Sequence, residues 1–139
     1  MLKKILLFAL ILGIGWLLLR LWRRVPRGAQ ATELSVRDLQ RGLRAGESWV
    51  VVDVRGAAEF NDDLGHIHDA RHVPLEALAV RIKDCAPSAT QAIALVCRTG
   101  SRARQAQRVL GRLGYQHACV VRGGMQEWVA AQLPVVRGG

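Results

Sequence analysis

The stretch AIALVCRTGSRARQAQR, residues 92–108, decides the fold of this chain. Its first five residues are all apolar, a pattern that predicts a strand buried on both faces of a sheet. Residues 101–113 follow a basic amphipathic pattern, which predicts a helix that ends at Gly114. A buried strand joined directly to a helix is typical of α/β proteins, in which the central sheet is parallel.

The same alternation of strands and helices is predicted on both sides of this stretch. Apolar runs at residues 49–54 and 118–121 predict two more buried strands, and residues 66–74 hold a short extended piece. Four further helices are expected: over residues 35–44, around residues 57–60, over residues 75–85, and from Gly123-Gly124 through Trp128. With 139 residues, the chain is long enough for one such domain and its core, but not for two.

Cys97 stands at the carboxyl end of the strand predicted over residues 92–96. Open α/β sheets bind ligands in the crevice outside the carboxyl ends of their strands. We expect the backbone N–H groups of residues 98–102 to converge on the sulfur, with Gly100 permitting the turn. Arg98 and Arg102 add positive charge, and all these features favour thiolate over thiol. Cys97 is therefore the candidate nucleophile, and the nearby arginines and glycine argue against a merely structural cysteine.

The sequence Cys97-x-x-Gly100-x-Arg102 after an apolar strand resembles the active-site loop of rhodanese domains. Further matches follow the family's order: VVDVR at residues 51–55, Glu59-Phe60, the GHI…A…VP stretch of residues 65–74, and VRGGM at residues 121–125 with Trp128. Together they cover about residues 33–135. The resemblance implies a rhodanese-like three-layer α/β domain over residues 33–136, in which helices flank a central parallel sheet.

The resemblance also implies an activity, that of a thiosulfate sulfurtransferase. Sulfane sulfur would pass from a small anionic donor, thiosulfate or a persulfide, to a thiol acceptor through a persulfide on Cys97, without metal or organic cofactor. The substrate-binding residues would be those after the cysteine: Arg98, Thr99, Gly100, Ser101 and Arg102. Phosphatase relatives of the family have seven residues from Cys to Arg, whereas this loop has six. The shorter loop favours sulfur transfer over phosphate or arsenate chemistry.

Asp53 and Arg55 lie at the end of the strand predicted over residues 49–54, at the same edge as Cys97 if the sheet is parallel. They are expected to support the site, either by orienting the loop or, as we prefer, as a structural ion pair such as Arg55 with Glu59. His68 and Asp69 stand where the family usually has Pro and Gly, which puts the shape of that loop in question.

Three histidines and two further cysteines are also candidates for site residues. His66, His68 and His72 alternate along the chain, but no Cys or carboxylate stands nearby at metal-binding spacing, so no metal is expected. Cys85 and Cys119 are interpreted as packed thiols. A redox or arsenate-reducing enzyme would need one of them beside Cys97 as a resolving thiol. Three cysteines without a CxxC spacing predict a reduced compartment and no disulfide framework.

Residues 5–19 form an unbroken apolar run that predicts a membrane anchor over residues 1–24, followed by a linker over residues 25–32. A cleaved signal peptide and a buried helix are the alternatives. The first 31 residues carry six of the chain's basic residues and no acid: Lys3, Lys4, Arg20, Arg23, Arg24 and Arg27. The net charge of +9 is thus largely a membrane-flank effect and does not indicate nucleic-acid binding.

Four arginines follow the apolar run and two lysines precede it, so the positive-inside rule places the C-terminal domain in the cytoplasm. The sequence thus predicts a single-pass protein of the inner (cytoplasmic) membrane. A second function remains open at this point: a tethered rhodanese-fold binding or scaffold module that serves a membrane-protein partner. Arg104, Arg108 and Arg112 form either a solvated helix face or a positive field that draws anionic donors toward Cys97.

Overall fold

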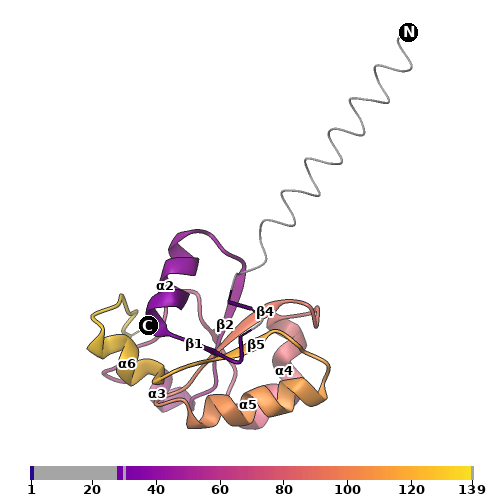
Figure 1. Ribbon diagram of the computed structural model, residues 1–139. Helices are drawn as coiled ribbons and strands as arrows, with labels where there is room; N and C mark the ends of the chain where they lie inside the picture. Colours follow the sequence, from indigo (N-terminus) through magenta and orange to yellow (C-terminus); the bar gives the residue numbers. More distant parts are fainter. Residues whose placement is uncertain (2–27, 30, 139) are drawn as a thin grey trace.

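The computed structural model describes Met1, residues 28 and 29, and residues 31–138 (Figure 1). Five strands form one sheet in the order β1-β5-β4-β2-β3, and every neighbouring pair is parallel. The strands are β1 (Glu33–Leu34), β2 (Trp49–Asp53), β3 (Arg71–His72), β4 (Ala92–Val96) and β5 (Ala118–Val121). The predicted central parallel sheet is confirmed, with the two-residue β1 as an addition.

Helices flank this sheet on both faces, as Figure 1 shows. They are α2 (Val36–Arg44), α3 (Ala57–Phe60), the 3₁₀ turn η1 (Leu75–Ala77), α4 (Leu78–Cys85), α5 (Ser101–Arg112) and α6 (Gly124–Ala130). Helices α4 and α5 pack against one face, whereas α2 and α6 pack against the other. The helix predicted over residues 75–85 is in fact a 3₁₀ turn followed by an α-helix.

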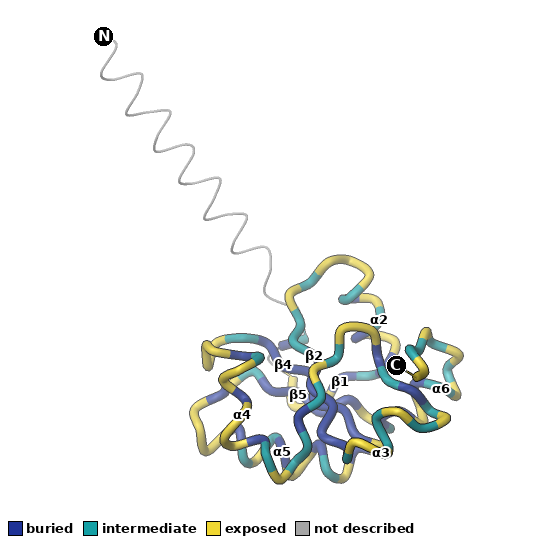
Figure 2. The backbone as a smooth tube through the Cα atoms, turned by 180° about the vertical axis from the view of Figure 1, so that it is seen from behind, coloured by how far each residue is buried: buried dark blue, intermediate teal, exposed yellow. Residues whose placement is uncertain are grey.

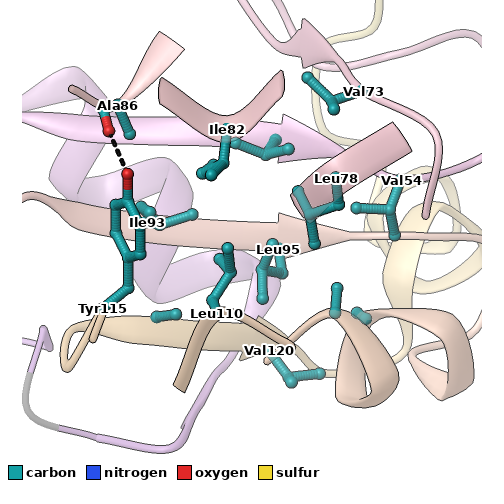
Figure 3. Packing of buried hydrophobic residues seen from close by; sticks show 14 of the residues in the cluster. Val54, Val73, Leu78, Ile82, Ala86, Ile93, Leu95, Leu110, Tyr115 and Val120 are labelled. Carbon is teal, nitrogen blue, oxygen red and sulfur yellow. Dashed lines mark hydrogen bonds between the residues drawn. The ribbon is translucent and has the colours of Figure 1, made fainter. Parts of the chain in front are cut away.

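Two hydrophobic cores lie on the two faces of the sheet because successive residues of each buried strand point to opposite sides. In β4, Ile93 and Leu95 belong to the core under α4 and α5, while Ala94 and Val96 belong to the other core. Figure 3 shows the first core, where the Tyr115 hydroxyl donates a 2.6 Å hydrogen bond to the Ala86 carbonyl. The strands form the buried centre of the tube in Figure 2, which explains their continuous apolar sequences.

The strand register fixes which residues meet at the carboxyl edge of the sheet. Asp53 pairs with Val96, Leu95 with Val120, and Leu34 with Val121. The residues that follow β1, β5, β4 and β2 therefore lie level with one another in a row: Ser35, Arg122, Cys97 and Val54. Cys97 therefore lies in the middle of the edge where α/β sheets bind ligands.

Within residues 28, 29 and 31–138, no helix is long and apolar enough to cross a membrane. The predicted anchor, apart from Met1, and residues 25–27 and 30 of the predicted linker lie outside the described residues. The described end of the linker packs on the domain: Ala29 is buried, and the Cys119 thiol donates a 2.8 Å hydrogen bond to the Ala31 carbonyl.

Candidate active site

Cys97 follows β4 directly, and its side chain is almost completely enclosed, with 1% of the residue exposed. The Gly100 N–H donates a hydrogen bond to Cys97 Sγ at 3.0 Å. Gly100 has a φ of 109°, a left-handed conformation that favours glycine, and α5 begins at the next residue. Of the five loop amides expected around the sulfur, all of which the structure describes, only that of Gly100 makes a hydrogen bond to it.

The active-site loop also rests on the first turn of α6. The Met125 N–H donates to the Cys97 carbonyl at 2.9 Å, and the Gln126 N–H donates to the Arg98 carbonyl at 3.1 Å. A Cβ on Gly124 would lie 2.4 Å from the Cys97 carbonyl oxygen, so only glycine allows this approach. Gly124 is thus a positioning residue for the loop. From the sequence alone the glycine pair is a family match with no assigned role, although two glycines opening a helix signal a close backbone approach.

The predicted substrate-binding residues surround the loop in different environments. Arg98, Thr99 and Ser101 are exposed, Arg102 is half-buried, and Gly100 is buried. Arg98 Nη1 lies 3.3 Å from Asp62 Oδ2. Arg98 and Arg102 thus both lie at the loop as expected. Each is paired with an acidic side chain, Arg98 with Asp62 and Arg102 with Glu59.

Arg102 makes a two-pronged ion pair with Glu59 of α3, with N···O distances of 2.6 and 2.7 Å. These hydrogen bonds lower the pKa of Glu59 from 4.5 to about 2, against the opposing effect of burial, and they raise the pKa of Arg102. The pair fastens the start of α5 to α3 and so holds one side of the active-site loop.

Asp53 and Arg55 form a buried ion pair, in which Arg55 Nη2 lies 2.7 Å from Asp53 Oδ2. Arg55 also donates to the backbone carbonyls of Glu59 (2.9 Å) and Gly65 (2.7 Å). Arg55 thus forms a structural ion pair, as the preferred interpretation of the sequence has it, but its partner is Asp53. The partner given there as an example, Glu59, is wrong, because the Glu59 carboxylate binds Arg102 instead. Arg55 orders the chain between β2 and β3 and does not contact the loop of Cys97 through any hydrogen bond of the described residues.

Comparison with known proteins places this geometry in a family. The family described as the rhodanese-like domain matches residues 35–131. The chain belongs to the rhodanese-like family. A sulfurtransferase from Allochromatium vinosum is 30% identical over 104 residues, which cover 75% of this chain and 94% of that protein. The thiosulfate sulfurtransferase PspE from Escherichia coli is 29% identical over 73 residues, covering 52% of this chain and 66% of PspE.

The solved structure of a rhodanese-related protein from Thermoplasma volcanium superposes on this rhodanese-like chain with a TM-score of 0.65. The two are 27% identical, and the match covers 75% of this chain and 96% of the other. The fold and the sulfurtransferase relatives together support sulfur transfer as the general activity of this domain.

His66, His68 and His72, the histidines considered as metal ligands, do not converge on one point. Phe60 stacks between His66 and His72, with ring centroids 3.9 and 4.5 Å apart, and exposed His68 lies 3.1 Å from Asp69. Asp69 has a φ of 60°, so it keeps the left-handed conformation for which the family uses glycine. Among the residues described, no group of three His, Cys, Asp or Glu side chains is arranged to hold a metal ion.

Cys85 and Cys119 lie away from Cys97 in this arrangement. Cys119 belongs to the core on the opposite face of the sheet. Cys85 ends α4 before the start of β4, whereas Cys97 follows the end of β4, so the two thiols lie toward opposite edges of the sheet. Burial raises the pKa of Cys85, and it raises that of Cys119 to about 11. Neither thiol is placed to act as the resolving partner of a redox enzyme.

Proposed function

We propose that this protein is a sulfurtransferase that moves sulfane sulfur from thiosulfate or a small persulfide to a thiol acceptor. The observation that carries the proposal is the enclosed Cys97 sulfur, which accepts a hydrogen bond from the Gly100 N–H in a loop of six residues from Cys to Arg. A hydrogen bond to a charged sulfur stabilises the thiolate, and it would equally stabilise a persulfide anion.

In the first half-reaction, the Cys97 thiolate attacks the outer sulfur of thiosulfate. A new S–S bond forms to Cys97, the S–S bond of thiosulfate breaks, and sulfite leaves with the bonding electron pair. The transferable sulfur then extends beyond the buried thiol by one S–S bond, about 2.05 Å. The arginines beside the loop, Arg98 and Arg102, lend positive charge to the binding of an anionic donor, while Thr99 and Ser101 offer hydroxyl groups at its exposed rim.

In the second half-reaction, a thiolate attacks the outer sulfur of the persulfide. The Cys97 S–S bond breaks, the acceptor leaves as a persulfide, and the Cys97 thiolate is regenerated. Covalent catalysis of this kind divides one transfer into two easier steps. Because sulfane sulfur only changes its carrier, the cycle needs no metal or organic cofactor.

Mass spectrometry of the intact full-length chain tests this proposal directly. After incubation with thiosulfate, the wild-type chain should gain one sulfur atom and release sulfite, and Cys97→Ser should do neither. Cys85→Ser and Cys119→Ser serve as matched controls and should still gain the sulfur. If neither thiosulfate nor a glutathione persulfide adds sulfur to the wild-type chain, the proposed function is wrong.

We further propose that residues 1–24 anchor the domain to the inner (cytoplasmic) membrane with residues 33–136 in the cytoplasm. The apolar run of residues 5–19 and its flanking basic residues support this placement. The full chain should sediment with membranes, and a variant lacking residues 2–27 should not. Protease added outside spheroplasts should leave the domain intact; its digestion would overturn the orientation.

A further inference from the structure

The two arginines of the active-site loop are held by acidic side chains from one neighbouring segment. Glu59 belongs to α3 and Asp62 to the turn that follows it, and α3 lies beside the start of α5 in Figure 1. Glu59 binds Arg102, and Asp62 binds Arg98. An anionic sulfur donor that approaches the loop therefore meets two arginines that each already have a negatively charged partner.

The two ion pairs differ in how easily a donor can open them. Arg102 is half-buried and makes two short hydrogen bonds to Glu59, of 2.6 and 2.7 Å. Arg98 is exposed and makes one hydrogen bond to Asp62, of 3.3 Å. Exposed ion pairs with a single contact contribute little free energy. Arg98 is therefore the arginine of the loop that an anionic donor can take from its partner.

The Asp62 carboxylate is itself held in place by groups other than Arg98. Its Oδ1 accepts a 2.9 Å hydrogen bond from the Leu64 N–H. The same oxygen lies 3.7 Å from Nη1 of the buried Arg55. These contacts leave Oδ2 directed to Arg98, at 3.3 Å. A donor that binds Arg98 therefore competes with a carboxylate that keeps its position.

We propose that Asp62 is a positioning residue that selects among sulfur donors by their charge, because it holds Arg98 away from the donor. A donor with two negative charges, such as thiosulfate, gains more from Arg98 than a donor with one, since the Coulomb energy is proportional to charge. Asp62 therefore disfavours thiosulfate relative to a singly charged thiosulfonate or persulfide. This inference rests on the proposed function, because it concerns the donor of the first half-reaction.

Single-turnover kinetics of the full-length chain with two donors test the inference. Asp62→Asn removes the charge of the carboxylate and keeps an oxygen that can accept from the Leu64 N–H. For thiosulfate, the half-saturating concentration should fall about fivefold, the upper end of what one exposed ion pair contributes, and the limiting rate of sulfite release should not change. Benzenethiosulfonate gives its outer sulfur to Cys97 and releases benzenesulfinate with the bonding electron pair. Its half-saturating concentration should fall only about twofold, because it carries one negative charge.

Two further variants separate this role from a structural one. Asp63→Asn is the matched control, because Asp63 is an exposed neighbour with no ion pair among the described residues. It should leave both half-saturating concentrations unchanged. When Asp62→Asn is added to Arg98→Gln, the fivefold effect should disappear, because the two residues act as a pair. An effect that persists without Arg98, or that is equal for the two donors, would overturn the inference.

A second measurement does not depend on sulfur transfer. Sulfate has the charge and the tetrahedral shape of thiosulfate but no sulfur to give, and its binding should slow the alkylation of Cys97 by iodoacetamide. The concentration of sulfate that halves this rate should be about fivefold lower in Asp62→Asn than in the wild-type chain or in Asp63→Asn. Such a result supports the role of Asp62 even if no donor adds sulfur to Cys97, which would contradict the proposed function alone. Equal protection of all three chains, or protection of none, would overturn the inference.

Discussion

Gly124 acts on the reaction without touching a substrate, because its missing side chain lets α6 approach the active-site loop. Its φ is 56°, and a Cβ added to it would lie only 2.4 Å from the Cys97 carbonyl oxygen, so a side chain does not fit there. The two α6 amides that bind the loop carbonyls follow directly in sequence. The position of the Cys97 sulfur therefore depends on a residue 27 positions away along the chain, between residues 97 and 124.

We expect Gly124→Ala to lower sulfur transfer by at least about tenfold and to destabilise the domain by about 2 kcal/mol, from left-handed strain and displacement of the loop. Thiosulfate turnover and urea unfolding measure the two effects. Gly111→Ala is the control, because no atom lies within 4 Å of its Cβ position in α5. That change should leave turnover intact and stabilise the helix by about 0.8 kcal/mol. Wild-type turnover in Gly124→Ala would remove the role assigned to this residue.

The helices α2, α5 and α6 are each followed by a residue in the left-handed conformation, which is glycine in two of them and glutamine in the third. Two residues beyond the last residue of the helix, α2 and α5 have a left-handed glycine, Gly46 and Gly114, whereas α6 has Gln132 with a φ of 58°. At α6 the Gln132 N–H donates to the Val129 carbonyl (2.9 Å), and the Leu133 N–H donates to the Trp128 carbonyl (3.2 Å). This pair of bonds defines the Schellman motif, in which glycine is the preferred residue.

We expect Gln132→Gly to stabilise the domain by about 1 kcal/mol, because glycine adopts the left-handed conformation without the cost that a side chain adds. The exposed Gln132 side chain makes no hydrogen bond among the described residues, so little is lost. Thermal unfolding should show a midpoint higher by about 4 °C. Gly114→Gln, at a position with open space around its Cβ, is the reciprocal change and should lower stability by a similar amount. Equal midpoints for wild type and Gln132→Gly would contradict this account of the helix end.

For the whole molecule, the sequence predicted what depends on local pattern. Neighbouring residues alone indicate the strands β2, β4 and β5, which are continuous apolar runs. They also indicate the turn at Gly100 after Cys97. The pairing of Arg102 with Glu59 joins residues 43 positions apart, and nothing in the sequence distinguishes Glu59 from Asp53 as the partner of Arg55. Such contacts follow from the register of the sheet, which a linear pattern does not contain.

The ion pair of Glu59 and Arg102 couples the stability of the whole domain to pH. The pKa of Glu59 is about 2 in the folded protein and near 4.5 when the chain is unfolded, so the unfolded state binds more protons between these values. The stabilisation is therefore complete above about pH 4.5 and is lost as the pH falls toward 2. Since the pair is partly open to solvent, we expect it to contribute about 1–2 kcal/mol at neutral pH, less than the full shift would imply.

Glu59→Gln should therefore lower the free energy of unfolding at pH 7 by about 1–2 kcal/mol, and this difference from wild type should shrink as the pH approaches 2. Urea unfolding at pH 7, 4 and 3 measures it. Glu76→Gln is the matched control, because Glu76 is exposed and has no ion pair among the described residues. It should follow the wild-type curve throughout. A constant difference between Glu59→Gln and wild type across this range would show that the pair does not account for the loss of stability in acid.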